Sequence, residues 1–374
     1  MNLRLGLLFL LLISMSCSNN SPGDMMVYDD NSLRLKWNKA YPDDTIHKSA
    51  VGLEWAISFI GAMLPNSPSA FIISGEVITI KPSELGLSSS GLSKLEQLHQ
   101  KIKASDEYQV TGVIDMGRYV TLLIGASEHY YEISGVPLHL EELVSGYTLA
   151  AEKGYVNDSG VSHEHRIIQF SEQLGLNQVF LSSETDPVTG EIYEYETVEV
   201  MPNGQIRFGI FDAAGNRKNS ADASHSNAGK PAKCMWCHES KIQGMFSVQN
   251  DYPGFLTYLQ LQDKFLSSQQ SLVAQRLALQ GGVDFSQTQE HTLTELLYIS
   301  FMEPSAERLS LEWGMPLIEV QQLLSSMPTH TYDEFPFLGI LYNRNDIEGF
   351  APFQGLTVSS SVREPSETEV NHIE

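Results

Sequence analysis

The spacing of hydrophobic and polar positions predicts an alternation of helices and strands in the first third of the chain. Residues 49–63 are predicted to form a helix that ends at Leu64-Pro65, and residues 90–103 have the helical period with polar residues on the opposite side. Residues 70–80 lie between them and are rich in β-branched residues, which favour a strand. The apolar stripe of the second helix consists of Leu92, Leu95, Leu98 and Ile102.

The middle of the chain changes toward shorter segments with β character. Pro202-Asn203-Gly204 is typical of a tight hairpin turn, and Ile206, Phe208 and Ile210 alternate in the strand that follows, so we expect these three side chains on one face. A polar stretch then continues from residue 213 to residue 233. In this region the pattern predicts strands at residues 108–114, 119–126, 130–133, 178–182, 193–201 and 205–211, and helices at residues 138–152 and 162–174.

The pattern becomes helical again beyond residue 255, with helices predicted at residues 256–265, 271–279, 293–299 and 316–325. Residues 359–374 are polar and have no period, so we expect them to be disordered. Taken together, the elements predict an α+β protein. It has a central antiparallel sheet with flanking helices, a loop after the last hairpin and a mostly helical C-terminal part.

The first residues resemble the signal peptide of a bacterial lipoprotein. Asn2 and Arg4 precede an apolar run at residues 5–13 that is too short to cross a bilayer, and Ser14-Met15-Ser16 leads into Cys17. The resemblance covers about the first two dozen residues and departs from the commoner Leu-Ala-Gly-Cys at Met15-Ser16. It implies cleavage before Cys17 and a lipid anchor on that cysteine. The alternative is an ordinary secretory signal with an incidental cysteine, and both interpretations export the protein.

The charge of the chain restricts its partners. Its 374 residues include 46 acidic and 23 basic ones, which gives a formal net charge of −23 at pH 7. Such a surface repels phosphate backbones, so we expect no binding to nucleic acid. With 42% hydrophobic residues, a chain of this length can bury a core without help from metals or disulfides.

The cysteines carry the most specific chemical signal. Besides Cys17, the chain contains only Cys234 and Cys237, and they stand in Cys234-Met235-Trp236-Cys237-His238. This is the spacing of covalent haem attachment, because two thiols three positions apart reach both vinyl groups on one edge of a porphyrin. The adjacent imidazole can then bind the iron. We therefore expect one covalent haem c, with Cys234 and Cys237 as tethers and His238 as the proximal ligand.

Other uses of a Cys-x-x-Cys pair stay open. In an exported protein, a structural or redox disulfide between Cys234 and Cys237 needs no cofactor. A thioredoxin-like site would require a strand that leads directly into a helix, whereas a hairpin and a polar loop are predicted here. A zinc site would require four ligands, and His225 is the nearest additional candidate.

The segment before the motif has a local resemblance of its own. Residues 204–215 read GQIRFGIFDAAG and are followed by a loop and then by Cys-x-x-Cys-His. This arrangement is similar to the β-sheet cytochromes c of the c-prime-beta kind, and it implies that a sheet, rather than a helical bundle, covers the haem. Only about fifty residues take part, and this chain departs from the family by continuing far beyond the motif, to residue 374.

The sixth coordination position of the iron decides between electron transfer and the binding of small molecules. Met315 is the distal candidate, because Met-Pro steps resemble the distal loop of class I cytochromes. Pro316 also suits the first turn of a helix, which favours a packing role for Met315. A vacant position would instead admit a ligand such as nitric oxide or peroxide. The remaining methionines and histidines are interpreted as core or surface residues, namely Met245, Met302, His163, His165 and His225.

Residues 191–196 alternate acidic and apolar positions, which we interpret as a strand with a solvated face rather than as catalytic carboxylates. The sequence thus predicts a lipoprotein anchored on the periplasmic side of the outer membrane. It carries single electrons to or from a protein partner, and the electron-carrier interpretation is favoured over that of an enzyme, which would be a haem-dependent oxidoreductase. A five-coordinate haem protein and a cofactor-free binding module with a disulfide are the alternatives. The predicted divisions are a signal peptide (1–16), a lipidated tether (17–38), a mixed α/β region (39–176), β hairpins plus the haem-binding loop (177–250), a helical region (251–358) and a disordered tail (359–374).

Overall fold

A computed structural model of the chain describes residues 31–64, 70–366 and 369–373. The predicted signal peptide and Cys17 lie outside these residues. The described residues belong to one compact unit that begins at Asn31. Leu33 and Leu35 of its first strand are fully buried, so the end of the predicted tether, residues 31–38, is part of the folded unit.

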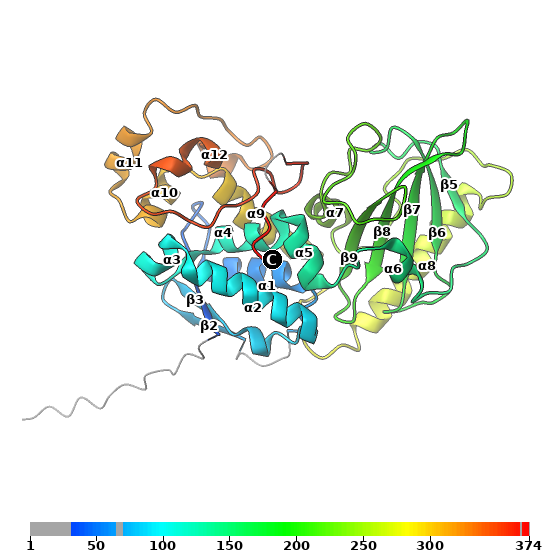
Figure 1. Cartoon of the computed structure of the whole chain (residues 1–374), viewed down its shortest axis with the longest axis horizontal. Helices are drawn as coiled ribbons and strands as arrows, with labels where there is room; N and C mark the ends of the chain where they lie inside the picture. The colour runs from blue at the N-terminus through cyan, green and yellow to red at the C-terminus, as the bar shows by residue number, and fades with distance from the viewer. Residues whose placement is uncertain (1–30, 65–69, 367–368, 374) are drawn as a thin grey trace, which may run out of the picture. The chain divides into compact units, whose positions relative to one another are not determined.

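The fold is α+β, as the sequence predicts, and it contains two sheets among the described residues (Figure 1). The four-stranded sheet has the order β2-β3-β1-β4, in which β4 is parallel to β1. The five-stranded sheet is an antiparallel meander in the order β5-β6-β7-β8-β9. The strands are β1 (Leu33–Lys36), β2 (Phe71–Ser74), β3 (Val77–Ile80), β4 (Ile114–Asp115), β5 (Gly154–Val156), β6 (His165–Phe170), β7 (Val179–Thr185), β8 (Ile192–Val200) and β9 (Ile206–Asp212).

The described chain also contains twelve α-helices. They are α1 (Ile46–Phe59), α2 (Ser89–Ala104), α3 (Asp106–Thr111), α4 (Met116–Val120), α5 (Ser127–Ser134), α6 (Leu140–Val144), α7 (Pro231–His238), α8 (Tyr258–Arg276), α9 (His291–Met302), α10 (Ala306–Trp313), α11 (Leu317–Leu323) and α12 (Arg344–Ile347). Shorter turns are η1 (Pro82–Glu84), the π-helical η2 (Thr121–Gly125), η3 (Thr288–Glu290), η4 (Pro336–Leu338) and η5 (Glu348–Phe350). None of the described helices is long and apolar enough to cross a membrane.

The predicted strands between residues 108 and 133 are wrong, because this segment forms α3, α4, η2 and α5 with only β4 as a short strand. Residues 116–127 are almost entirely buried, with hydrophobic side chains around the whole helix circumference. A helix buried on all sides has no polar face, so its sequence looks like that of a buried strand. The aromatic and β-branched residues of this segment favour strands, so the sequence predicts β structure here.

Two predicted helices are also wrong. Residues 138–152 contain only the short helix α6, and residues 162–174 contain the strand β6. The strand pairs with β7 in a regular antiparallel register, and this pairing overrides a weak helical pattern. In two other places the number of elements differs: residues 70–80 form the hairpin of β2 and β3 instead of one strand, and the single helix α8 covers most of two predicted helices.

The β8–β9 hairpin is confirmed, with its turn at Pro202-Asn203-Gly204. Asn203 is buried and its amide donates to the carbonyl oxygens of Ser58 and Ala62, which fixes the turn against the end of α1. Beyond β9 the chain crosses a loop and enters α7, which contacts β9 (Figure 1). The hairpin therefore sets the position of the Cys-x-x-Cys-His segment.

Residues 359–366 and 369–373, the described part of the predicted tail, are packed rather than disordered. Val362 and Ile373 are buried, and Ser359 is almost inaccessible. The backbone carbonyl of Arg363 accepts a hydrogen bond from the backbone N–H of Lys230, just before α7. A polar segment can be ordered by such contacts without a hydrophobic period of its own.

Candidate functional site

Helix α7 carries the two cysteines and the histidine of the Cys-x-x-Cys-His motif on one face. It begins at Pro231, whose fixed φ and missing N–H suit the first turn of a helix. Cys234, Cys237 and His238 follow at positions i, i+3 and i+4, which lie together on a helix surface. The three side chains therefore point the same way, although the sequence placed them in a loop.

The backbone turns sharply directly after the motif. Glu239 and Ser240 both have positive φ, 47° and 61°, a conformation that is strained for residues other than glycine. This turn brings the chain back so that the carbonyl of Lys241 lies 3.4 Å from Nδ1 of His238. A ring whose Nδ1–H donates to a carbonyl keeps Nε2 as its free lone pair, which is the arrangement of a metal-ligating histidine.

The imidazole is also held in the form that binds a metal. Burial lowers the pKa of His238 to about 4, so the ring is neutral near pH 7. Its ring packs against Phe208 of β9, with 5.5 Å between the ring centroids. A neutral, oriented imidazole is what coordination to iron requires.

A cavity of about 400 Å³ lies in front of this helix face. Cys234, Cys237 and His238 line one wall of it, and one face of the five-stranded sheet forms another, including Ile168, Phe180 and Val198. The remaining walls come from residues 243–246, from Phe265 of α8 and from the loops at 159–161 and 227–228. Its size and mainly apolar walls are those of a cofactor site.

The strand register sorts the side chains on this sheet face into three rows that cross β6 to β9. The row nearest the proposed iron ligand is apolar, the next is mixed and the third is ionic. They consist of Phe170, Phe180, Val198 and Phe208, then Ile168, Ser182, Glu196 and Ile210, then Arg166, Glu184, Glu194 and Asp212. Arg166 and Glu196 both line the cavity, so its floor changes from apolar to charged along the strands.

The ionic row is crowded with negative charge. Glu184 and Glu194 are fully buried and stand directly opposite each other, an arrangement that is destabilising for like charges. The guanidinium of Arg166 neutralises part of this charge by forming two ion pairs. Its Nε lies 2.6 Å from Glu184, and its Nη2 lies 3.2 Å from Glu196. Burial raises the pKa of Glu184 to about 8, against the attraction of Arg166 and with a further rise from Glu196. The hydroxyl of Ser162 donates to the same carboxyl group.

The two thiols are free and are not tuned for redox exchange. Burial, and then the nearby carboxylate of Glu196, raises the pKa of Cys234, and burial also raises that of Cys237. Thiols that exchange disulfides have a lowered pKa, because the thiolate is the nucleophile. The environment of this pair is therefore unlike that of a thioredoxin-type site.

The C-terminal segment, residues 361–366 and 369, contacts α7 and the residue before it. The ammonium group of Lys230 is buried and lies 2.7 Å from Oε2 of Glu369 and 2.9 Å from the carbonyl of Ser361. The guanidinium of Arg363 lies over the indole ring of Trp236, 4.4 Å from its centroid. The extra length of this chain beyond the motif thus serves in part to hold the motif helix.

The structure places Met315, the predicted distal candidate, away from the cavity and Met245 on its wall. Met315 packs against the cluster of α10, α11 and α12, and it does not line the cavity wall. Met245, interpreted from the sequence as a core residue, is 45% exposed and lines the cavity. His225 stacks on Tyr193, and His165 bonds to the hydroxyl of Tyr155.

Sequence reasoning missed the charged floor of the cavity. The acidic alternation around Glu194 and Glu196 was interpreted as a solvated face, whereas Glu194 is buried. The arginine that pairs with this face, Arg166, lies in a segment predicted to be helical. With β6 assigned as a strand, the period of two would have placed Arg166 and Ile168 on one face.

The residues present fit a covalently attached porphyrin. They supply two thiols and an imidazole along one wall and an apolar sheet face opposite, and the cationic side chains among the lining residues are Arg166 and Lys233. The described residues hold no group of three or more His, Cys, Asp or Glu side chains that could hold a metal ion by themselves. A haem iron needs no such group, because the porphyrin supplies four of its ligands.

Comparisons with known proteins add nothing to these observations. No protein-family model, curated protein or solved structure matches the chain.

Proposed function

We propose that this chain is a membrane-anchored c-type cytochrome that carries one covalent haem and transfers single electrons on the periplasmic side of the membrane. The observation that carries the proposal is the cavity in which Cys234, Cys237 and His238 face an apolar sheet. A bound haem iron would change between its ferric and ferrous forms by one electron.

The residues of the chain have separate roles in this proposal. Cys234 and Cys237 would hold the haem as thioethers, each formed by addition of S–H across one vinyl group, so no oxidant would be needed. His238 would hold the iron through Nε2, because its Nδ1 lies against the carbonyl of Lys241. Phe180 and Val198 would exclude water from the bound group, which would strengthen the influence of nearby charges on it.

The N-terminal cysteine would supply the membrane anchor. Acyl chains on Cys17 and its amino group hold a protein at a membrane without a spanning helix. The net charge of −23 favours a redox partner with a basic docking surface, because complementary charge accelerates encounter.

The first test is expression of the full chain in a bacterium that has the machinery for c-type haem attachment. We expect a haem stain after denaturing electrophoresis and a Soret absorption band in the purified protein. The double variant Cys234→Ala/Cys237→Ala should lose both. Cys17→Ser is the matched control, because it removes a cysteine and should release the protein from the membrane fraction without loss of haem.

A wild-type protein without stain and Soret band, with the mass of polypeptide and lipid alone, would refute the proposal. Such a result would leave a cofactor-free lipoprotein as the better interpretation. His238→Ala separates attachment from ligation. The stain should remain, because the thioether bonds survive, while the absorption spectrum changes and is restored in part by added imidazole.

A five-coordinate site that binds small molecules is the second candidate. It is favoured by the cavity walls, whose side chains besides His238 include one thioether, that of Met245. Met245 is half-exposed at the cavity rim, so its sulfur is weakly held for a ligand. Carbon monoxide added to the reduced protein separates the two: an unchanged spectrum supports the electron carrier, and a shifted Soret band supports the open site.

A further inference from the structure

We propose that reduction of the iron is coupled to the uptake of one proton by the carboxyl group of Glu184. This inference rests on the proposed haem attachment and names a property of the same site. If it is correct, the chain transfers an electron together with a proton, and its reduction potential depends on pH.

The geometry links Glu184 to the cavity through one side chain. Glu184 follows Ser182 on the cavity face of β7, one row beyond the residues that line the wall. Arg166 lines the cavity, and its Nε lies 2.6 Å from Oε1 of Glu184. The same guanidinium reaches Glu196, which also lines the cavity. A change of charge in the cavity therefore alters the protonation of Glu184 electrostatically, because little water lies between them to screen it.

The charges around Glu184 leave room for one proton. It faces Arg166 from β6 and Glu194 and Glu196 from β8, and Lys218 lies 3.4 Å from Glu194. These groups are three carboxylates and two cations, and Asp212 at the end of the ionic row is partly exposed to solvent. On the side of α7, Cys234 and Cys237 would be uncharged thioethers once haem is attached, so they add no charge to this cluster. One carboxyl in such a cluster is therefore able to take up a proton when the positive charge in the cavity decreases.

Reduction would shift this balance by one unit of charge. The iron gains an electron from a one-electron donor protein and becomes ferrous, and Glu184 gains a proton from solvent and becomes a neutral carboxylic acid. Electron and proton are both taken up, so the net charge of the site is unchanged. The hydroxyl of Ser162, which is half-buried and donates to Glu184, provides the hydrogen-bonded contact between this carboxyl and the protein surface.

The test is the reduction potential of the haem-loaded full chain, measured by spectroelectrochemical titration between pH 5 and pH 10. Because burial raises the pKa of Glu184 to about 8, the dependence should centre near that pH. The equilibrium constant for reduction should fall by up to tenfold for each pH unit, which is about 59 mV per unit. Infrared difference spectra should show a carboxylic acid band that appears on reduction.

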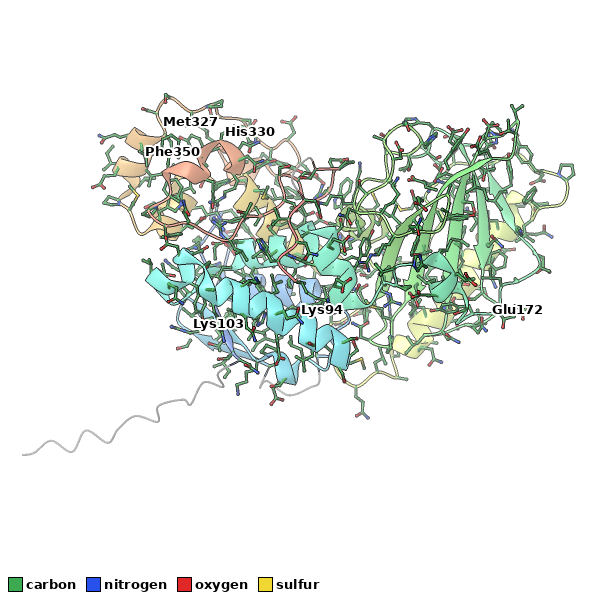
Figure 2. The ribbon with its side chains drawn as sticks, in the orientation of Figure 1. Lys94, Lys103, Glu172, Met327, His330 and Phe350 are labelled. Carbon is green, nitrogen blue, oxygen red and sulfur yellow. The ribbon has the colours of Figure 1, made fainter. Side chains whose placement is uncertain are left out.

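Three variants sharpen the test. Glu184→Gln keeps the size and hydrogen bonding of the side chain and should abolish both the slope near pH 8 and the infrared band. Glu196→Gln removes a negative neighbour and should move the slope to lower pH without abolishing it. Glu172→Gln is the matched control, because Glu172 is exposed in the segment between β6 and β7 (Figure 2). The reduction potential of this variant should depend on pH in the same way as that of the wild type.

A wild-type potential that is constant between pH 7 and pH 9 would overturn the coupling while leaving haem attachment intact. The same holds for a Glu184→Gln protein that retains the full slope and the band. If Glu184→Gln does not fold, the wild-type slope and band decide the question alone. Absence of covalent haem would instead refute the proposed function, so the two failures are distinguishable.

Discussion

The phenyl ring of Phe208 and the imidazole of His238 lie against each other, with 5.5 Å between their centroids and 42° between their planes. Phe208 belongs to β9 and His238 ends α7, so this contact joins the sheet to the motif helix. The backbone of Phe208 is also held in place, because its N–H donates a hydrogen bond to the hydroxyl of the buried Tyr130. The position of the proposed iron ligand thus depends on the strand register of β9.

Replacing this ring should destabilise the protein strongly. Phe208→Ala removes a side chain that is 1% exposed, and such truncations cost about 3–5 kcal/mol. Phe208→Leu should cost less, because most of the volume is kept. Urea unfolding in the Cys234→Ala/Cys237→Ala background measures the free energy of unfolding without haem. Val188→Ala is the control at a 91% exposed position and should change it by less than about 0.5 kcal/mol. A Phe208→Ala cost no larger than the control's would show that the ring is not packed as described.

Met315 should have no influence on the haem spectrum. It packs beside α10 and α11, and its backbone is fixed by Ser310, whose hydroxyl donates to the Met315 carbonyl. Met315→Leu should therefore leave the absorption spectrum of the haem-loaded protein unchanged and cost less than about 1.5 kcal/mol of stability. Met245→Leu is the comparison at the cavity wall. Any displacement of the Soret band in Met315→Leu would contradict the placement of Met315 away from the cavity.

The Cys-x-x-Cys-His motif and the β8–β9 hairpin were readable from the sequence because each rests on local spacing. The turn chemistry of Pro202-Asn203-Gly204 and the alternation of Ile206, Phe208 and Ile210 depend on neighbours a few positions apart. The motif needs only five consecutive residues. The sequence did not predict its placement on a helix, because Pro231–His238 is too short a segment to show a helical period.

The cavity depends on contacts between distant segments, so the sequence did not predict it. Its charged floor forms because β6 pairs with β7 in a register that sets Arg166 opposite Glu184. A shift of one residue would move Arg166 to the other face of the sheet. The C-terminal segment is ordered for the same reason: its residues bond to Lys230, which is distant in the sequence. A local pattern does not predict such contacts.

The buried pair of Lys230 and Glu369 should contribute much more to stability than the exposed pair beside it. Glu369→Ala would leave the buried ammonium of Lys230 without its carboxylate, which costs about 3–5 kcal/mol. Lys230→Met combined with Glu369→Ala should recover most of this loss. The control is Glu364→Ala, which breaks the Lys233–Glu364 pair, where Glu364 is 57% exposed, and should cost less than about 1 kcal/mol. Equal losses for Glu369→Ala and Glu364→Ala in a urea titration would argue against an ordered C-terminal segment.

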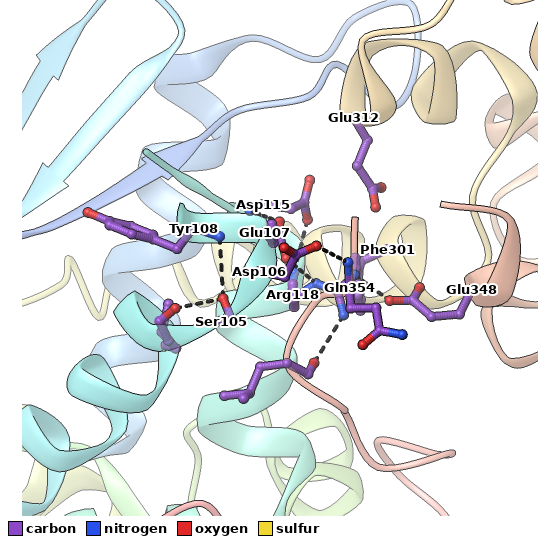
Figure 3. A network of polar contacts seen from close by, with 12 residues as sticks. Ser105, Asp106, Glu107, Tyr108, Asp115, Arg118, Phe301, Glu312, Glu348 and Gln354 are labelled. Atoms are coloured by element: carbon purple, nitrogen blue, oxygen red, sulfur yellow. Dashed lines mark hydrogen bonds and ion pairs between the residues drawn. The ribbon is translucent and has the colours of Figure 1, made fainter. Parts of the chain in front are cut away.

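The polar network around Phe301 should make the protein sensitive to acid (Figure 3). Both carboxylate oxygens of Glu312 accept from Arg344 at 2.8 Å, and Arg308 binds the same group. Burial alone would raise the pKa of Glu312, but the two guanidinium groups lower it to about 2 from a normal 4.5. Because the folded-state pKa is depressed, this carboxylate stabilises the fold fully above pH 4.5, and its contribution is lost as the pH falls from 4.5 to 2.

Glu312→Gln should therefore lower the free energy of unfolding at pH 7 by about 3–5 kcal/mol, because two buried arginines each lose one of their two carboxylate partners. Its stability should then fall less than that of the wild type between pH 4.5 and pH 2. Glu348→Gln is the matched control, since Glu348 contacts Arg118 and Arg344 in the same network but its side chain is 34% exposed. Solvent already screens that carboxylate, so its removal should cost less and leave the acid dependence in place. If urea titrations at several pH values gave Glu312→Gln the same acid dependence as the wild type, other carboxyl groups would have to account for the acid sensitivity.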